Sequence, residues 1–454
     1  MRALFFRLGV DRAVLLTLFA RGWGVGAGLL TIGFVTRFLS PELQGFYYTF
    51  YSLIALQVFA ELGLNFAIVQ FSSHEMAHLT WAPDGTVTGD PGAKRRLQSL
   101  LSFAVTWFGV AAVLLVAVLG PAGVRFFARA SAAAGGTSVA VPWLLLVVFS
   151  AANLLVNAFA ALLEGCGRVA ETVLLRLFQS VAATLGIWAM LGAGGRLYAV
   201  AASSSMMTLV GAAWLLLRHR AFYRDLLAHP RTLPGMSWRR ELWPFQWRIA
   251  VSFTSGYMLT QLFNPLLLSL RGPAEAGRMG LSLQVLSAMN GAAIAWITTK
   301  APTYGQLIAK GQTQALKALF GRGVAQSFAF LVLSMFSVWS MLLYLSTTGS
   351  KYAMRVLPLP LFSLLCLAGL GNHFVMAQAA YLRAHKQEPF MWLSIANGFA
   401  TAALAIPLVS LWGAGGAVIA YTCTALLIGF GGGTFVFLRK RRQWDTQRAE
   451  PTAS

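Results

Sequence analysis

Long uninterrupted apolar runs constrain the fold of this 454-residue chain more than any other feature. Each run has roughly 20 residues or more, and at about 1.5 Å per residue such a helix crosses the roughly 30 Å hydrocarbon core of a bilayer. The sequence predicts membrane spans near residues 13–37, 45–70, 98–120, 140–164, 170–192, 197–217, 246–270, 277–299, 323–345, 356–380, 389–412 and 414–438. The expected fold is an all-α integral membrane protein with about 12 transmembrane helices.

Composition excludes several classes of protein. Hydrophobic residues make up 57% of the chain and charged residues 11%, whereas a soluble domain carries about 25% charged residues. This excess of apolar residues excludes a soluble enzyme, a nucleic-acid-binding protein and a disordered chain. An outer-membrane barrel is excluded as well, because its strands alternate in polarity and these runs do not. The three cysteines are far apart and form no C-x-x-C pair, so we expect no disulfide framework and no cysteine zinc site. No cofactor and no metal site are predicted for the leading function.

The basic residues predict the orientation of the chain. With the N-terminus in the cytoplasm, 25 of the 35 Lys and Arg fall on the cytoplasmic side, eight fall on the other side and two fall inside spans. This asymmetry satisfies the positive-inside rule and also places the C-terminus in the cytoplasm. We therefore expect a multi-pass protein of the inner cell membrane with both termini cytoplasmic.

The chain is expected to consist of two halves. A basic polar stretch at 218–245 separates an N-terminal six-helix bundle, residues 1–217, from a C-terminal six-helix bundle with a basic tail, residues 246–454. The loop that begins at Pro41 and the loop that begins at Pro273 share a Pro-x3-Gly pattern with an acidic residue inside it. Their equivalent places predict two pseudo-repeated bundles around a central cavity, as in many secondary transporters.

Three ionisable residues fall inside predicted spans: Arg21, Glu61 and Arg176. A charge at mid-membrane costs about 2.5–3.5 kcal/mol on insertion scales, so such residues usually have a function or a partner. One interpretation is that Arg21 and Glu61 pair and lock two helices together. The other is that all three line a hydrated cavity, because each lies roughly 10–14 Å from the inner end of its span.

Further polar residues support the cavity. Gln57, Glu61 and Asn65 are spaced four apart and are expected to form one stripe on a helix. Cations outnumber Glu61 around the predicted cavity, which favours an anionic ligand. The predicted substrate-binding residues are Arg21, Gln57, Asn65, Arg176, Arg248, Gln261, Asn264, Asn290 and Lys300. The cations would hold phosphate or acidic sugar, the amides would contact hydroxyls, and Glu61 is the candidate ion-coupling residue.

One motif indicates a different chemistry. His74-Glu75-Met76-Ala77-His78 matches H-E-x-x-H, which on a helix places two imidazoles on one face with a glutamate base. A catalytic zinc also needs a third protein ligand. The sequence offers no evident one, so a membrane zinc protease is kept as an alternative, and a polar helix end at the membrane surface is the simpler interpretation.

Several segments resemble the polysaccharide-repeat (O-antigen-type, Wzx-like) flippases of the multidrug/oligosaccharidyl-lipid/polysaccharide exporter superfamily. These segments are Ser-Pro-Glu-Leu-Gln-Gly-Phe-Tyr at 40–47, Ala-Glu-Leu-Gly-Leu-Asn at 60–65, Trp-Pro-Phe-Gln-Trp-Arg at 243–248 and Gln-Leu-Phe-Asn-Pro at 261–265. The resemblance implies two six-helix bundles around a cationic cavity. It also implies alternating access that moves an undecaprenyl-diphosphate-linked oligosaccharide from the cytoplasmic to the periplasmic leaflet.

The resemblance also defines alternatives and partners. A cation-coupled drug exporter of the same superfamily usually carries an acidic residue in the first span, where this chain has Arg21. A glycan polymerase or ligase would usually need a sizeable external loop, and none is predicted. The expected partners are the lipid-linked oligosaccharide, membrane lipids and glycan assembly proteins, with no nucleic acid. Of these, anionic lipid best fits the basic 218–245 stretch.

Overall fold

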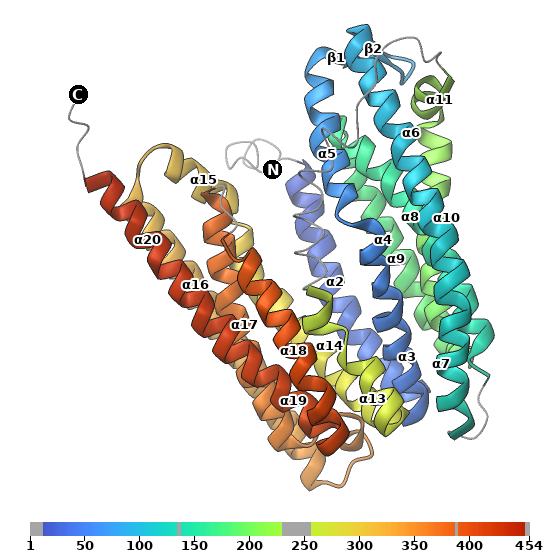
Figure 1. The fold of residues 1–454 in the computed structure, drawn as a ribbon, viewed down its shortest axis with the longest axis vertical. Helices are drawn as coiled ribbons and strands as arrows, with labels where there is room; N and C mark the ends of the chain where they lie inside the picture. The colour runs from blue at the N-terminus through green and yellow to red at the C-terminus, as the bar shows by residue number, and fades with distance from the viewer. Residues whose placement is uncertain (1–11, 134–137, 229–255, 386–388, 450–454) are drawn as a thin grey trace. The chain divides into compact units, whose positions relative to one another are not determined.

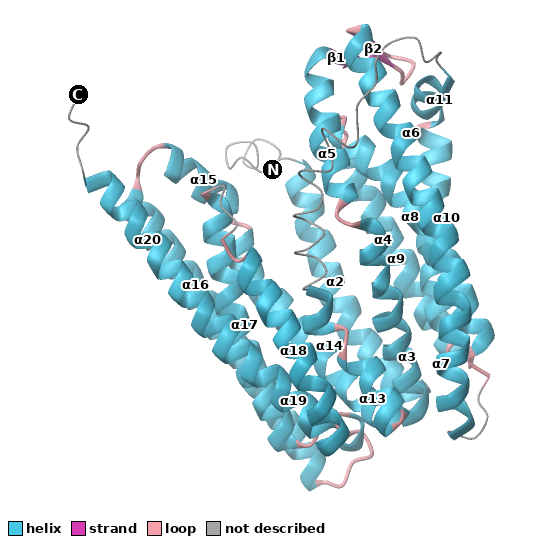
Figure 2. Ribbon diagram, in the orientation of Figure 1, coloured by secondary structure: helices cyan, strands magenta, loops and turns pink. Residues whose placement is uncertain are grey.

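The computed structural model describes residues 12–133, 138–228, 256–385 and 389–449, and nearly all of them are helical (Figure 2). Contacts among them divide the chain into two compact units. Unit 1 comprises Met1–Leu43 and Phe50–Thr254, and unit 2 comprises Gln44–Thr49 and Ser255–Ser454. Six residues of one helix therefore belong to the unit formed by the second half of the sequence.

Unit 1 contains most of the first half of the chain (Figure 1). Its α-helices are α2 (Arg12–Phe38), α3 (Pro41–Ile54, shared with unit 2), α4 (Val58–Glu61), α5 (Leu64–Glu75), α6 (Pro91–Leu114), α7 (Gly120–Ala133), α8 (Ala140–Gly165), α9 (Val169–Gly192), α10 (Tyr198–Arg218) and α11 (Arg220–Ala228). The 3-10 turns η1 (Ala55–Gln57) and η2 (Met76–His78), the π-helical turn η3 (Leu115–Leu119), and the strands β1 (Leu79–Trp81) and β2 (Val87–Gly89) complete it.

Close helix contacts hold unit 1 together. Helix α10 approaches α8 and α9 at Gly211, where an added Cβ would lie 2.5 Å from atoms of Gln179 and Val156. The Ser150 and Ser204 hydroxyls lie 3.0 Å apart across the α8–α10 contact. Small residues that let backbones approach, together with interhelical hydrogen bonds, are the usual means of packing helices in a membrane.

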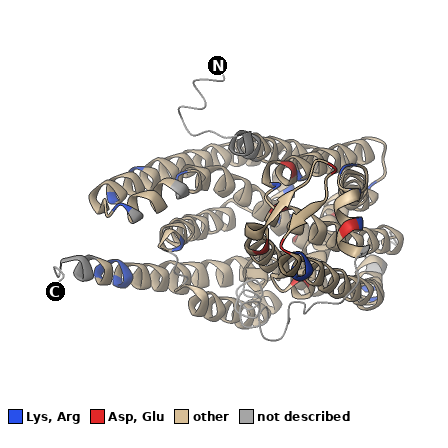
Figure 3. Cartoon of the chain, turned by 90° about the horizontal axis from the view of Figure 1, so that it is seen from above, with Lys and Arg blue, Asp and Glu red and all other residues tan. Residues whose placement is uncertain are grey.

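Ion pairs gather at the end of unit 1 that carries β1 and β2. Lys94 Nζ lies 2.8 Å from Asp225 Oδ2, which ties the start of α6 to α11. Glu171, in the first turn of α9, lies 3.1 Å from Arg168 and 3.2 Å from Arg218. Figure 3 shows acidic and basic residues side by side around the two strands. Each of these acidic side chains in unit 1 therefore offsets nearby positive charge.

The same end of unit 1 contains a buried titratable group, His219. Its ring is 8% exposed, and burial lowers its pKa below the ordinary 6.5 despite the Glu171 carboxylate 3.0 Å away. Because the unfolded chain then binds the proton more readily, stability is complete above pH 6.5 and declines as the pH falls below it. We expect the Tm of the purified protein to fall between pH 7.5 and 5.5, and H219Q to reduce this slope. H78Q, which changes an exposed histidine, should retain the original slope.

Unit 2 is built mainly from the second half of the chain (Figure 1). Its α-helices are α13 (Phe263–Arg271), α14 (Pro273–Thr298), α15 (Ala301–Ala309), α16 (Thr313–Thr347), α17 (Leu359–Ala384), α18 (Met391–Trp412), α19 (Ala414–Cys423) and α20 (Gly433–Ala449). A 3-10 turn, η5 (Ala353–Arg355), precedes α17, and a π-helical stretch, η6 (Thr424–Gly432), joins α19 to α20.

The two predicted repeat loops are helix starts in the structure. Pro41 and Pro273 begin α3 and α14, each followed by an acidic residue in the first turn. The shared segment of α3 packs on α14, where Gln44 Nε2 donates to the carbonyl of Gly277 at 2.8 Å. The Pro-x3-Gly repeat thus marks one helix–helix contact inside unit 2.

Charged side chains fasten the helix ends at α18 and α19. Arg271 donates to the carbonyls of Ser410 and Leu411 at 2.6 and 2.8 Å. Glu275 accepts from the backbone N–H of Ala414 at 2.8 Å. A cation at a helix C-terminus and an anion at a helix N-terminus satisfy free backbone groups and complement the helix dipoles.

Most of the predicted spans agree with the described helices. Among the described residues, nine helices are long and apolar enough to cross a membrane, and a bent pair, Pro41–Glu61 with Leu64–His78, makes a tenth if it is one span. The span predicted at 13–37 coincides with α2, and the one predicted at 246–270 lies partly outside the described residues. The chain is therefore a multi-pass, all-α membrane protein.

Candidate functional site

The second predicted span is broken. It passes from α3 through the 3-10 turn Ala55–Gln57 into the short helix α4, and then bends by 42° into α5. The break is at Leu62 and Gly63, which adopt left-handed conformations with φ of 46° and 69°. The prediction that Gln57, Glu61 and Asn65 form a stripe on one continuous helix is therefore wrong.

The break nevertheless brings two of these residues together. Glu61 is the last residue of α4, Asn65 lies in the first turn of α5, and Asn65 Nδ2 donates to Glu61 Oε2 at 3.4 Å. Gln57 is at the end of the 3-10 turn, and all three side chains are half-buried. The three predicted residues thus flank a helix break rather than line a helix face.

The backbone carbonyls at the break accept hydrogen bonds from a side chain of another helix and from the first turn of α5. The carbonyl of Ala60 accepts from Trp107 Nε1 on α6 at 3.0 Å. The carbonyl of Gly63 accepts from the N–H groups of Phe66 and Ala67 at 3.1 and 3.3 Å. Non-helical backbone at membrane depth persists only where protein buries it or where it lines a hydrated cavity. Such breaks form substrate and ion sites in transporters.

Unit 2 also has predicted site residues at or near the ends of helices. Gln261 lies in a turn that leads into α13, and Asn264 is buried in the first turn of that helix. Asn290, in α14, donates to the Leu286 carbonyl at 3.2 Å. Lys300, between α14 and α15, donates from Nζ to Gln326 Oε1 on α16 at 3.4 Å.

The predicted cations differ in their surroundings. Arg176 has a side chain that is 57% exposed and pairs with Glu164 at 2.6 Å. Glu164 belongs to the last turn of α8, which comes beside α9. Arg21 lies in α2, but its side chain is outside the described part of the structure, and Arg248 lies outside the described residues.

The H-E-x-x-H segment lacks the geometry of a zinc site. Helix α5 ends at Glu75 and continues as a 3-10 turn through His78, so the two histidines do not share an α-helix. Glu75 is buried and accepts from Arg96 Nε at 2.7 Å, which removes it as a free base. No cluster of three potential metal ligands occurs in the part of the chain that the structure describes. The motif is a helix end fixed by an ion pair.

Unit 2 contains a buried polar group that the sequence analysis missed. Ser327 Oγ donates to the Ala293 carbonyl at 2.6 Å and lies 2.7 Å from Nε2 of the fully buried His373. Since the hydroxyl has only one proton, it accepts the second bond, so Nε2 carries the histidine proton. The signal in the sequence was a lone histidine inside an apolar run, which is uncommon in membrane helices.

Comparisons with known proteins identify the family. The sequence profile of a family described as "Polysaccharide biosynthesis protein" matches residues 11–307, which is more than half of the chain. A search among curated proteins found no match.

Solved structures show the same fold at low sequence identity. An inward-facing multidrug resistance MATE family transporter of the MOP superfamily is 16% identical over 94% of this chain and 99% of its own, with a TM-score of 0.64. Lipid II flippase MurJ, in an inward closed conformation, is 10% identical over 95% of this chain and 87% of its own, also with a TM-score of 0.64. The Vibrio cholerae MATE transporter VcmN is 11% identical over 95% and 96%, with a TM-score of 0.58.

These solved structures are described as transporters and a flippase. The chain belongs to the polysaccharide biosynthesis protein family, and it is a multi-pass membrane protein with the fold of the MOP-superfamily transporters.

Proposed function

We propose that this protein moves an undecaprenyl-diphosphate-linked oligosaccharide from the cytoplasmic to the periplasmic leaflet of the inner membrane by alternating access. The family match carries the proposal, because it connects a membrane transporter fold with polysaccharide biosynthesis. The lipid II flippase with the same fold handles, by its name, a lipid-linked substrate. Arg21, Arg176, Arg248 and Lys300 would bind the diphosphate or acidic sugars, and the amides at both helix breaks would contact hydroxyls.

Moving a sugar headgroup across the membrane requires a polar path through the protein. A sugar headgroup cannot cross hydrocarbon alone, because each hydroxyl that loses its hydrogen bonds costs several kcal/mol. Gln57, Asn65, Gln261 and Asn264 supply amide groups beside broken helices, where backbone groups add further partners. Moving about two negative charges outward gains roughly 4–5 kcal/mol per 100 mV of membrane potential, negative inside. The membrane potential alone therefore assists export of a diphosphate.

Deletion of the gene tests the proposal. We expect lipid-linked oligosaccharide to accumulate in the inner membrane and surface glycan to disappear, and the wild-type gene to restore both. R21A and R176A should insert at normal levels and fail to restore surface glycan. R129A, at an exposed arginine near the end of α7, is the matched control and should restore it. Unchanged surface glycan in the deletion strain would contradict the proposal.

A multidrug exporter is the second candidate, favoured by the fold shared with MATE transporters. Export of cationic drugs needs carboxylates in the membrane. Glu61 lies at the break of the second span, whereas Glu164 is paired with Arg176. A deletion strain that keeps its surface glycan and becomes sensitive to cationic drugs would favour this candidate.

A further inference from the structure

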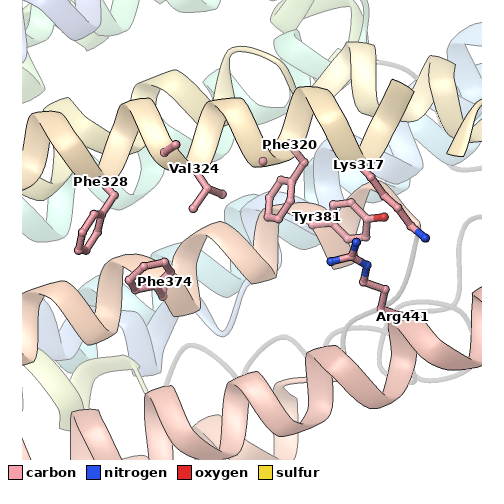
Figure 4. A pocket seen from close by; sticks show the side chains of 9 residues that line it. Lys317, Phe320, Val324, Phe328, Phe374, Tyr381 and Arg441 are labelled. Atoms are coloured by element: carbon pink, nitrogen blue, oxygen red, sulfur yellow. The ribbon is translucent and has the colours of Figure 1, made fainter. Parts of the chain in front are cut away.

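A groove of about 390 Å³ lies among α16, α17 and α20, within unit 2 (Figure 4). Its volume falls in the roughly 300–1,000 Å³ range of sites that hold small molecules. Helix α16 lines it from Lys317 to Phe328, α17 contributes Phe374 and Tyr381, and α20 contributes Arg441. All of these residues belong to one unit, so the groove is complete without the rest of the chain.

The groove is polar at one end and apolar at the other. Figure 4 shows Lys317, Arg441 and the Tyr381 hydroxyl together at one end, and Phe328 and Phe374 at the opposite end. Lys317 and Phe328 are eleven residues apart on α16, which corresponds to about 16 Å of helix. Two cations above an extended aromatic and aliphatic wall match an amphiphile with an acidic head and a hydrocarbon chain.

Positive charge predominates on the helices that line the groove. The three helices that line it contain eight Lys and Arg and a single acidic residue, Asp445. The basic end of the groove therefore retains a field that attracts anions, as basic pockets between membrane helices do for acidic lipid headgroups.

The walls of the groove are fixed and leave room for a chain. The Phe320 ring packs 4.7 Å from Tyr381, and Phe328 packs 5.0 Å from Phe374, measured between ring centroids. Gly321 faces the groove with no atom within 4 Å of the position that a Cβ would occupy. A preformed site of this kind loses little conformational freedom when a ligand binds.

We propose that this groove binds one acidic membrane phospholipid. Its phosphate lies between Lys317 and Arg441, and one acyl chain runs along Phe320 and Val324 to Phe328. The long apolar wall favours a lipid over free phosphate, because a phosphate alone would leave that wall without a partner. The proposal concerns a resident lipid and does not depend on what the protein transports.

Native mass spectrometry of the purified full-length protein tests the lipid site. Phosphatidylglycerol should bind in preference to phosphatidylcholine with the same chains. K317Q/R441Q should weaken phosphatidylglycerol binding about 25-fold, because each Lys or Arg near an anionic lipid contributes about a factor of five. G321F should block the chain and abolish binding of phosphatidylglycerol.

Matched variants separate the groove from general effects. K310Q/R439Q removes two other exposed cations of unit 2, and G109F adds the same side chain at an open glycine of α6; both should bind phosphatidylglycerol like the wild type. Equal binding of the two phospholipids, or unchanged binding in K317Q/R441Q and G321F, would overturn the proposal. Stronger competition by inorganic phosphate than by phosphatidylglycerol would overturn the choice of a lipid. Binding of undecaprenyl phosphate without phosphatidylglycerol would assign the groove to the transported lipid instead.

Discussion

E61Q is expected to reduce delivery of glycan to the cell surface by about tenfold or more while the protein still reaches the membrane. Glu61 ends α4 at the break of the second span, and its carboxylate accepts from Asn65 at 3.4 Å. Glutamine keeps the size of the side chain and the bond from Asn65, so the variant removes only the ionisable group. An interaction of a charged group is worth about 1.5–3 kcal/mol, which corresponds to a loss of about tenfold or more in transport rate. Surface glycan in a complemented deletion strain measures the effect.

A second carboxylate of the same bent span provides the control. Glu42, in the first turn of α3, is outside the break, and E42Q should restore surface glycan to the wild-type level. If E61Q also restores it, Glu61 serves only to shape the helix break and has no role in ion coupling. If E61Q and E61A both fail while N65A succeeds, the ionisable group itself is required.

The spans could be predicted from the sequence because lipid imposes a simple rule. A chain in hydrocarbon must satisfy its backbone internally, so long apolar runs become helices whatever surrounds them. The run at 140–164, for example, is α8, Ala140–Gly165. The helix starts at Pro41 and Pro273 were instead predicted as loops, although a proline followed by an acidic residue is typical of the first turn of a helix.

The break in the second span could not be predicted in the same way. Gly63 suggests a break, but Leu62 has no preference for a left-handed conformation. The bond that satisfies the freed carbonyl of Ala60 comes from Trp107, which is 47 residues away in the sequence. Such a conformation is fixed by tertiary contacts, and a periodicity of four residues cannot reveal it.

The ion pairs of unit 1 could not be predicted from the sequence for a related reason. Arg176 was predicted as a charge within a span and no partner was assigned to it; its partner Glu164 lies across the turn between α8 and α9. The pair depends on where each helix ends, and helix ends are the least certain part of a sequence-based prediction. The same reason hid the pairs of Lys94 with Asp225 and of Arg96 with Glu75.

G45A is expected to lower the Tm of the purified protein by several degrees, although alanine favours a helix over glycine by up to about 1 kcal/mol. The shared segment of α3 packs on the start of α14 so closely that a Cβ at Gly45 would overlap the backbone carbonyl of Pro273. A steric overlap with a backbone atom cannot be relieved by a change of side-chain rotamer. Overpacking of this kind lowers the free energy of unfolding by about 1–3 kcal/mol or more.

The sign of the effect distinguishes contact from helix propensity. Gly109, in the interior of α6, has no atom within 4 Å of an added Cβ. G109A should therefore keep or raise the Tm, whereas G45A lowers it. Equal Tm values for G45A and the wild type would contradict the close contact between α3 and α14. Gln44 and Gly45 of the first Pro-x3-Gly segment make this contact with Gly277 and Pro273 of the second, so we expect these residues to contribute to the stability of unit 2.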